Sequence, residues 1–418
     1  MNYKLLAIVL FVIMYLYKML ISLLGLRSEK NPIPENVSDV YDRETYEKWR
    51  AYHAETNRFG MLSFSVSALV SILLLVFNAY AAFAKLFPEG LFWQTFSVML
   101  LSSLASLIDL PFSWHDTMVI EQKYGFNKST AKTFWADQVK SFIIMLFIMT
   151  GLGSLLSALH RALGDRLVPA FAIAMTLIVL LVAFLYPILS WIFNKFTPLE
   201  EGELRDKLTA LLEKNGYKVR AINVMDASRR TTRSNAYFSG FGKMKTIVLF
   251  DTLIESQTPD EICAVFAHEL GHGLHKDTMK NQILVFLQMA VIAAFAGFTL
   301  HTAEIFTQFG FDGINYGFAL LLIIGVEFPV ISPLTALVTN YFSRKAEYAA
   351  DAHAVKEGYG EQLITSLKTL SKENFSNLAP DPLVVKLEYS HPTLSQRIDA
   401  IRKLTSGQEG NQRRNVDT

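Results

Sequence analysis

The sequence has few charged residues and almost no cysteine. Asp, Glu, Lys and Arg make up 18% of its 418 residues, below the roughly 25% that is usual for soluble domains. The net charge of +1 and the lack of a basic stripe with interleaved aromatic residues give no case for nucleic acid as a partner. The single cysteine, Cys263, excludes a disulfide within the chain and a cysteine-based zinc knuckle. We expect it to be a buried, inert thiol.

Long apolar runs take the place of the missing charge. Hydrophobic residues make up 51% of the chain and the mean hydropathy is +0.27, so a mainly α, multi-span integral membrane protein is predicted. The first run has no small-x-small cleavage site after it, which favours a membrane span over a signal peptide. Seven runs are long enough to cross a bilayer about 30 Å thick. They lie near residues 4–25, 61–84, 92–110, 140–160, 168–193, 283–305 and 314–336.

Lysine and arginine gather in the loops on one side of these spans. The first loop, the loop at 111–139, the segment at 195–281 and the segment after 340 are rich in them, whereas the other loops carry few. The positive-inside rule therefore places the N-terminus outside, and the C-terminus and large polar segments in the cytoplasm. The sequence does not distinguish the endoplasmic reticulum from a bacterial inner membrane.

The chain is predicted to consist of alternating membrane and polar segments. The polar segment at 196–280 contains an amphipathic helix that ends near Asn215. Strand-like runs at AINVMDAS and KTIVLFD follow it, so a small α+β unit is predicted. The assigned segments are 1–195 (spans one to five), 196–280 (polar), 281–340 (spans six and seven), 341–406 (polar) and 407–418 (a disordered tail).

Residues 268–272, HELGH, match the pattern H-E-x-x-H. On a helix, His268 and His272 lie on one face and can bind one zinc ion, and Glu269 lies beside the metal, where it can take a proton from a bound water. A helix is predicted here because Thr258 and Glu261 form a capping box shortly upstream.

A catalytic zinc ion needs a third protein ligand. The metzincin spacing does not supply one, because His275 follows too closely. Glu347 and Asp351 lie four residues apart on a predicted helix face, so that one carboxylate can bind zinc while the other orients a ligand histidine; the alternative is a solvated face. His353 lies off this face and is predicted to be a surface residue. His275 and Asp277 either support a metal ligand or are polar residues at the solvent-exposed end of the helix.

Five stretches together resemble the type I CAAX prenyl proteases, which are integral-membrane zinc endopeptidases. They span most of the chain in family order, and HExxH alone would not support the resemblance. The stretches are VIEQKYGFNKST (119–130), RSNAYFSGFGKMKTIVLFDTLI (233–254), AHELGHGLHKD (267–277), SRKAEYAAD (343–351) and SHPTLSQRI (390–398). The resemblance implies seven transmembrane helices around a water-filled intramembrane chamber, with a small zincin-like α+β metalloprotease domain on the cytoplasmic side.

The resemblance also implies roles for individual residues. For Asn235 and His391 the role is implied only by the resemblance. On its own, Asn235 is typical of a turn residue and His391 is typical of a residue at a helix start. The implied roles are one zinc ion bound by His268, His272 and Glu347, general base catalysis by Glu269, substrate-backbone binding by Asn235, oxyanion stabilisation by His391, support of that region by Arg397 and orientation of a ligand by Asp351.

The implied reaction is zinc-assisted hydrolysis that removes the last three residues of prenylated CAAX proteins. Two alternatives remain open at this point. One is a broader protease that trims membrane-associated peptides; the other is a non-enzymatic membrane scaffold or carrier with a structural zinc ion, which an intact Glu269 disfavours.

Glu327 lies within the last apolar run, where an ionisable group is costly in lipid, so we expect it to face a cavity.

Overall fold

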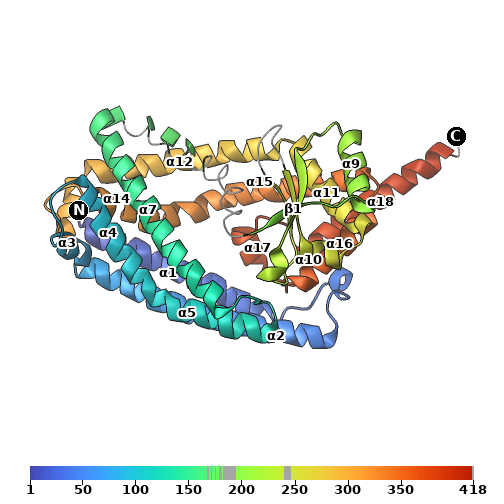
Figure 1. Ribbon diagram of the computed structural model, residues 1–418, viewed down its shortest axis with the longest axis horizontal. Coiled ribbons are helices and arrows are strands. Elements are labelled where there is room, and N and C mark those ends of the chain that lie inside the picture. The colour runs from blue at the N-terminus through green and yellow to red at the C-terminus, as the bar shows by residue number, and fades with distance from the viewer. Residues whose placement is uncertain are drawn as a thin grey trace.

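The computed structural model describes residues 1–418 except 167–168, 171, 175, 178–180, 182–193, 240–245 and 417–418. Long helices form one end of the molecule, and a four-stranded sheet with shorter helices forms the other (Figure 1). The N-terminus lies at the helical end, whereas the C-terminus lies beyond the sheet.

Six of the described helical runs are long and apolar enough to cross a membrane. They correspond to six of the seven predicted spans, and the remaining one, at 168–193, lies largely outside the described residues. The six runs are Tyr3–Ser28, Arg43–Val76, Leu91–Tyr124, Ala131–Leu163, Met279–His301 and Tyr316–Lys356. Their helices are α1 (Tyr3–Ser28), α2 (Arg43–Val76), α4 (Leu91–Ala105), α5 (Leu110–His115), α6 (Gln122–Tyr124), α7 (Ala131–Leu163), α12 (Asp277–His301), α14 (Tyr316–Leu322) and α15 (Phe328–Lys356).

Two helices end before the predicted spans do, because apolar composition continues through a turn in the backbone. The second span was predicted to run to residue 84, but α2 ends at Val76, and α3 (Ala79–Ala84) begins after Asn78 turns the chain with φ 55°. Likewise the sixth span ends with α12 at His301, and the short helix α13 (Ala303–Gln308) follows it.

Large apolar side chains are exposed along the long helices. On α1, for example, Leu5, Leu16 and Leu23 are each more than half exposed, and Ser28 is the only buried residue of the helix. So much apolar surface is unfavourable in water but suits the hydrocarbon of a bilayer. The helical end is therefore built to be covered by lipid.

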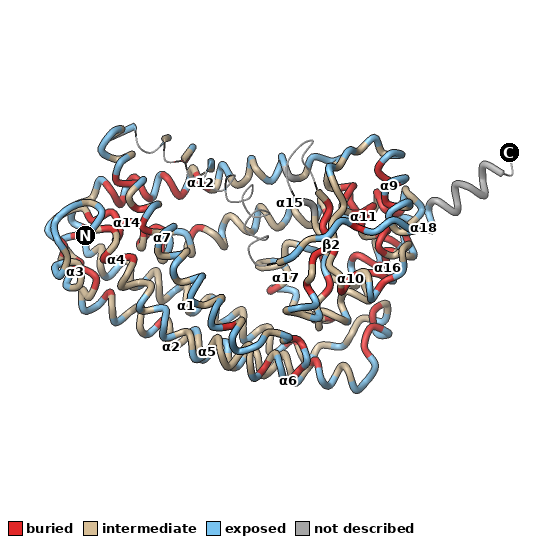
Figure 2. Tube along the Cα trace, in the orientation of Figure 1, coloured by how far each residue is buried: buried red, intermediate tan, exposed pale blue. Residues whose placement is uncertain are grey.

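Most of the described buried residues gather in two large cores, one at each end, and two smaller clusters accompany them (Figure 2). The core of the helical end includes the fully buried rings of Phe306, Phe309 and Phe318. The core of the sheet end includes Trp49, although this residue belongs to α2. The first turns of α2 are thus part of the polar, sheet-containing end of the protein.

The sheet has the strand order β1-β2-β4-β3, so β3 is an edge strand. β2 and β4 are parallel, and β1 and β3 are antiparallel to their neighbours. Both predicted strand-like runs and the amphipathic helix before them are confirmed. The elements are β1 (Phe196–Pro198), α9 (Glu203–Lys214), β2 (Ala221–Met225), β3 (Ala236–Ser239), β4 (Thr246–Phe250), α10 (Asp251–Ser256) and α11 (Pro259–Leu274).

The C-terminal segment is helical. After α15 it forms α16 (Gly360–Glu373), α17 (Pro382–Glu388) and α18 (Leu394–Val416). The last of these helices, α18, continues to Val416, and the disordered tail at 407–418 stays a prediction. Ile401 of this helix is fully buried.

Candidate metal centre

Helix α11 presents the HExxH residues, and its start is fixed by the predicted capping box. The Thr258 side chain accepts a hydrogen bond from the amide of Glu261, and the Glu261 carboxylate accepts one from the amide of Thr258. Further along, Gly271 lies against α15, where an added Cβ atom would lie 3.0 Å from the Cα atom of Ala350. The lack of a side chain at Gly271 therefore allows the two helices to approach closely, one turn from Glu347.

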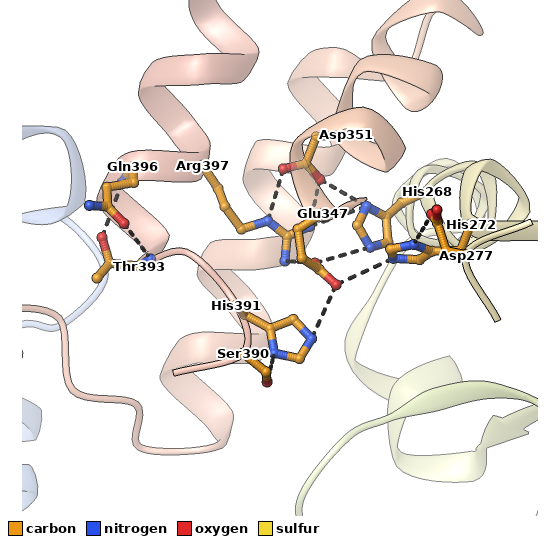
Figure 3. Close-up of polar contacts among 10 residues, drawn as sticks. All are labelled: His268, His272, Asp277, Glu347, Asp351, Ser390, His391, Thr393, Gln396 and Arg397. Atoms are coloured by element: carbon orange, nitrogen blue, oxygen red, sulfur yellow. Dashed lines mark hydrogen bonds and ion pairs between the residues drawn. The ribbon is translucent and has the colours of Figure 1, made fainter. Parts of the chain in front are cut away.

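The close approach brings His268, His272 and Glu347 together (Figure 3). The Nε2 atom of His268 lies 3.5 Å from one carboxylate oxygen of Glu347, and the Nε2 atom of His272 lies 3.3 Å from the other. Potential ligand atoms of the three residues all lie within 4.8 Å of one another. The three predicted metal ligands thus converge on one point.

The other nitrogen of each histidine is held by a second carboxylate. The Nδ1 atom of His268 lies 2.8 Å from Oδ1 of Asp351, and the Nδ1 atom of His272 lies 3.1 Å from Oδ2 of Asp277. A neutral histidine that donates through Nδ1 directs its Nε2 lone pair toward the centre. Glu347 therefore faces the centre while Asp351 orients His268. The structure also places Asp277, whose role the sequence left open, against His272.

The donor set fits a divalent metal ion. Oε2 of Glu347 is buried and accepts no hydrogen bond among the described residues, and a buried carboxylate oxygen needs a cationic partner. The nearest guanidinium nitrogen, Nη1 of Arg397, lies 3.4 Å away and forms an ion pair with this oxygen but no hydrogen bond. Arg397 directs its two hydrogen bonds to carboxylate at Asp351 instead, at 2.9 Å and 2.5 Å. Two imidazoles and one carboxylate form one of the ligand sets of catalytic zinc.

Electrostatics at the centre favour positive charge. Burial opposes protonation of His272, but the carboxylates of Glu347, Asp277 and Glu269 outweigh burial and raise the pKa of His272 to about 9. A site that stabilises a proton on a ligand histidine also stabilises a metal cation that replaces the proton.

Glu269 lies beside the three clustered side chains rather than among them. It is half-buried and lines a small, mostly apolar cavity between α11 and the sheet, together with Ala236 and Tyr237 of β3. A group at this position can meet a water molecule or a substrate that approaches along the edge strand.

His391 reaches the centre from the loop between α17 and α18. Its Nε2 atom lies 3.2 Å from Oε1 of Glu347, and most of its side chain is exposed. The sequence analysis missed a residue that holds this loop: the guanidinium of Arg344, on α15, donates to the carbonyl oxygen of Tyr389 at 2.6 Å. The signal was an arginine one turn before Glu347, but only the fold shows what it contacts.

Arg397 is buried and supports Asp351, to which it donates two hydrogen bonds. Its Nη2 atom also lies 3.3 Å from Nδ1 of His268. The shorter contact of the His268 Nδ1 atom is with Asp351, so we place the His268 proton between Nδ1 and Asp351.

The prediction that His353 lies at the surface was wrong. His353 is buried, because it packs where α15 meets Gly271 of α11.

Asn235 stands apart from the other predicted site residues. It is exposed at the start of β3, and its carbonyl oxygen accepts a hydrogen bond from the amide of Phe250. Within the described part of the chain, no hydrogen bond or ion pair links its side chain to the three clustered residues. Its predicted role therefore depends on substrate that the strand would bind.

Two family models match consecutive parts of the chain. The model described as "CAAX prenyl protease N-terminal, five membrane helices" matches residues 22–195, and "Peptidase family M48" matches residues 198–405. The CAAX prenyl protease 1 homolog of Arabidopsis thaliana is 34% identical over 410 residues, which cover 93% of this chain and 95% of the relative. The chain belongs to the CAAX prenyl protease 1 family.

Other members of this family are similar over the same extent. CAAX prenyl protease 1 of Saccharomyces cerevisiae is 33% identical over 412 residues, which cover 88% of each chain. The crystal structure of S. mikatae Ste24p superimposes with a TM-score of 0.89 at 27% identity, covering 96% of this chain and 99% of that one. As a CAAX prenyl protease 1 family member, the protein is a multi-pass membrane metalloendopeptidase.

Proposed function

We propose that the protein is a zinc-dependent endopeptidase that removes the C-terminal tripeptide of prenylated CAAX proteins. The observation that carries this proposal is the arrangement of His268 and His272, which turn their Nε2 atoms toward Glu347 while carboxylates hold their Nδ1 atoms. Two imidazoles and a carboxylate would bind one zinc ion per chain and leave its fourth position for water.

Glu269 would transfer the proton, and His391 would stabilise the developing negative charge. Zinc, when bound, lowers the pKa of a water molecule and polarises the scissile carbonyl. Glu269 would accept a proton from the attacking water and pass it to the leaving amine, so that the C–N bond would break and the carbonyl carbon would gain the hydroxyl group. His391, exposed beside Glu347, would donate a hydrogen bond to the negatively charged oxygen of the tetrahedral intermediate. Arg397 contributes indirectly, since it holds Asp351.

The edge strand β3 is the proposed binding surface for the substrate backbone. An extended peptide can add to a free strand edge through main-chain hydrogen bonds. β3 is the last strand in the described sheet, and its residues Ala236 and Tyr237 line the same cavity as Glu269. Asn235, which precedes the strand, would hold the substrate backbone near the scissile bond.

A lipidated substrate would explain why the site lies next to the membrane. Two residues separate α11 from α12, and the candidate membrane span in α12 begins at Met279. In the proposed arrangement seven spans surround a water-filled chamber, the N-terminus lies outside, and the metal centre faces the cytoplasm. Because the relatives are named as CAAX prenyl proteases, we favour a prenylated substrate over general peptide trimming.

A pair of peptides tests the proposal. The purified protein is incubated with a farnesylated CAAX peptide and with its non-lipidated twin, with and without a chelator and with zinc added back. We expect cleavage three residues from the C-terminus of the farnesylated peptide, lost with chelator and restored by zinc. Equal cleavage of both peptides would favour the broader protease, and cleavage of neither would contradict the proposed function.

A further inference from the structure

Arg233 ties the start of the edge strand to the sheet-end parts of two of the long helical runs. This residue lies two positions before Asn235, and its Nη2 atom donates to the hydroxyl of Tyr52 at 2.9 Å and lies 3.4 Å from Oε1 of Glu121. The guanidinium carbon lies 4.9 Å from the ring centroid of Phe126. Tyr52 is on α2, and Glu121 is in the helical run Leu91–Tyr124.

The partners of Arg233 are themselves fixed. The hydroxyl of Tyr52 donates to Oε1 of Glu121 at 2.5 Å. The ring of Tyr52 packs at a steep angle against the rings of Tyr124 and Phe126, each with centroids 5.1 Å away. A hydrogen-bonded pair held in an aromatic cluster presents a rigid receptor to the planar guanidinium group. We call Arg233, Tyr52, Glu121 and Phe126 the strand clasp.

The backbone before Arg233 is joined to the same membrane-proximal loop. Thr231 forms an isolated antiparallel bridge with Asn127, and the amide of Lys128 donates to the carbonyl oxygen of Arg230 at 3.2 Å. These residues and the clasp partners Glu121 and Phe126 all belong to VIEQKYGFNKST (119–130), a motif for which the proposed reaction supplies no role.

On the other side, the same segment is held by the protease end. The hydroxyl of Thr252 donates to the carbonyl oxygen of Arg233 at 3.0 Å, and the side-chain amide of Asn374 donates to the carbonyl oxygen of Ser234 at 3.4 Å. The segment that leads into β3 is therefore fixed between the membrane helices and the sheet-end core.

The position of this segment sets the register of β3. β3 pairs with β4 so that Ala236 lies opposite Leu249, and a strand rises about 3.3 Å per residue. A peptide that adds to the outer edge of β3 takes its own register from β3, and a slip of one residue reverses which side chains face the site. Such a slip would also bring a different peptide bond to Glu269.

We propose that Arg233 is a positioning residue: the strand clasp fixes the register of β3 against the metal centre and thereby selects the peptide bond that is cut. The inference rests on the proposed function, in which β3 binds the substrate. It also gives the motif at 119–130 a role, because that motif supplies the receptor for Arg233. Arg233 does not touch the reacting atoms in this scheme and acts through β3.

The test compares Arg233→Gln with Arg220→Gln in the full-length protein. Arg220 is an exposed arginine that precedes β2 as Arg233 precedes β3, so it is a matched control. With the farnesylated peptide, we expect Arg233→Gln to lower kcat/KM roughly ten- to hundredfold, since small misplacements are costly. Mass spectrometry should show products cut one bond away from the normal site. Arg220→Gln should keep the normal product, and metal content should be unchanged in both variants.

Milder variants test the inference if Arg233→Gln folds poorly. Glu121→Gln and Tyr52→Phe each remove part of the receptor, and both should give the same displaced products. Combining Glu121→Gln with Arg233→Gln should add little to Arg233→Gln alone, because both act on one interaction. Normal products with unchanged kcat/KM in Arg233→Gln, or fully additive effects, would overturn the strand clasp.

A second readout does not depend on turnover. Hydrogen–deuterium exchange of residues 234–239 without substrate should rise in Arg233→Gln while exchange of α11 stays the same. Unchanged exchange at β3 would refute the strand clasp even if the peptide were never cleaved. By contrast, an inactive wild-type protein with raised exchange in the variant would refute only the proposed function.

Discussion

Asp351 joins His268 to Arg397 through one carboxylate. Its Oδ1 atom accepts from Nδ1 of His268 at 2.8 Å, and the guanidinium of Arg397 donates to both of its oxygens. Asp351 is fully buried, so its negative charge requires both partners. Asp351 thus orients His268 through Nδ1, and Asp351 is itself held by Arg397 of α18, far along the sequence.

Replacing the two orienting carboxylates should weaken metal binding to different extents. We expect Asp277→Asn to lower zinc affinity by roughly 10- to 100-fold, as for other residues that orient a ligand histidine. Asp351→Asn should lower it at least as much and also destabilise the fold, because it leaves Arg397 buried without its anion. Metal titration and thermal unfolding measure the two effects. Equal affinity in wild type and both variants would contradict the orienting role.

Glu269→Gln should retain the metal and lose turnover. Glu269 lies beside the cluster of His268, His272 and Glu347 and is not one of the converging groups, so an amide at this position leaves the donor set intact while removing the proton acceptor. Elemental analysis should give about one zinc ion per chain, as in the wild type. His272→Ala is the matched comparison, which should lose the metal as well. Proteolysis by Glu269→Gln would refute its assignment as the general base.

Gly271→Ala should separate α11 from α15. The added Cβ atom would lie 3.0 Å from backbone of Ala350, which has no freedom to move away, and overpacking of this kind costs about 1–3 kcal/mol. Because Glu347 is one turn away on α15, zinc affinity should fall together with stability. Chemical unfolding and metal titration of the purified variant provide the measurement.

Gly273→Ala is the control for this substitution. Its added Cβ atom would meet the ring end of Tyr217, with the hydroxyl oxygen at 2.5 Å, and a side-chain end can rotate away more readily than a helix backbone can shift. We therefore expect a smaller loss of stability and unchanged zinc affinity. If Gly273→Ala lowered zinc affinity as much as Gly271→Ala does, close helix packing would not explain the geometry of the centre.

Local signals in the sequence predicted the elements of the site, but not the contacts between them. The capping box at Thr258 and the spacing of His268 and His272 depend only on neighbouring residues, so helix α11 and its metal-binding face were predictable. The sequence left two carboxylates as possible third ligands, because Glu347 and Asp351 share a helix face. Only the packing of α15 on α11 shows that Glu347 faces the centre.

The ends of helices and the buried polar contacts depended on the fold. Hydropathy did not reveal the turn at Asn78, since the residues on both sides of it are apolar. His353 was predicted to lie at the surface because its position next to Gly271 depends on how two distant helices cross. In the same way, nothing local to Arg233 indicates Tyr52 as its partner, 181 residues away.

Zinc affinity should fall as the pH falls. The carboxylates around His272 raise its pKa to about 9 in the metal-free protein, so below that pH a metal ion must displace a proton from this ligand. Affinity should therefore decrease by up to about tenfold for each pH unit below the pKa and level off above it. Competition with a chelator of known pH dependence measures the change. An affinity that is constant from pH 9 to pH 7 would contradict the raised pKa.

Cys263 should be unreactive in the folded protein. The residue is fully buried on α11, and burial raises the pKa of its thiol to about 11. Since the thiolate is the reactive form, roughly one molecule in a thousand carries it at pH 8. A maleimide reagent should therefore label the protein only after unfolding. Because the sequence has one cysteine, labelling reports directly on the core that supports the HExxH helix.

The two glycine variants extend this test. In Gly271→Ala, labelling of Cys263 should become faster as α11 and α15 separate, whereas Gly273→Ala should label at the wild-type rate. Rapid labelling of the native wild-type protein would show that this core is open to solvent.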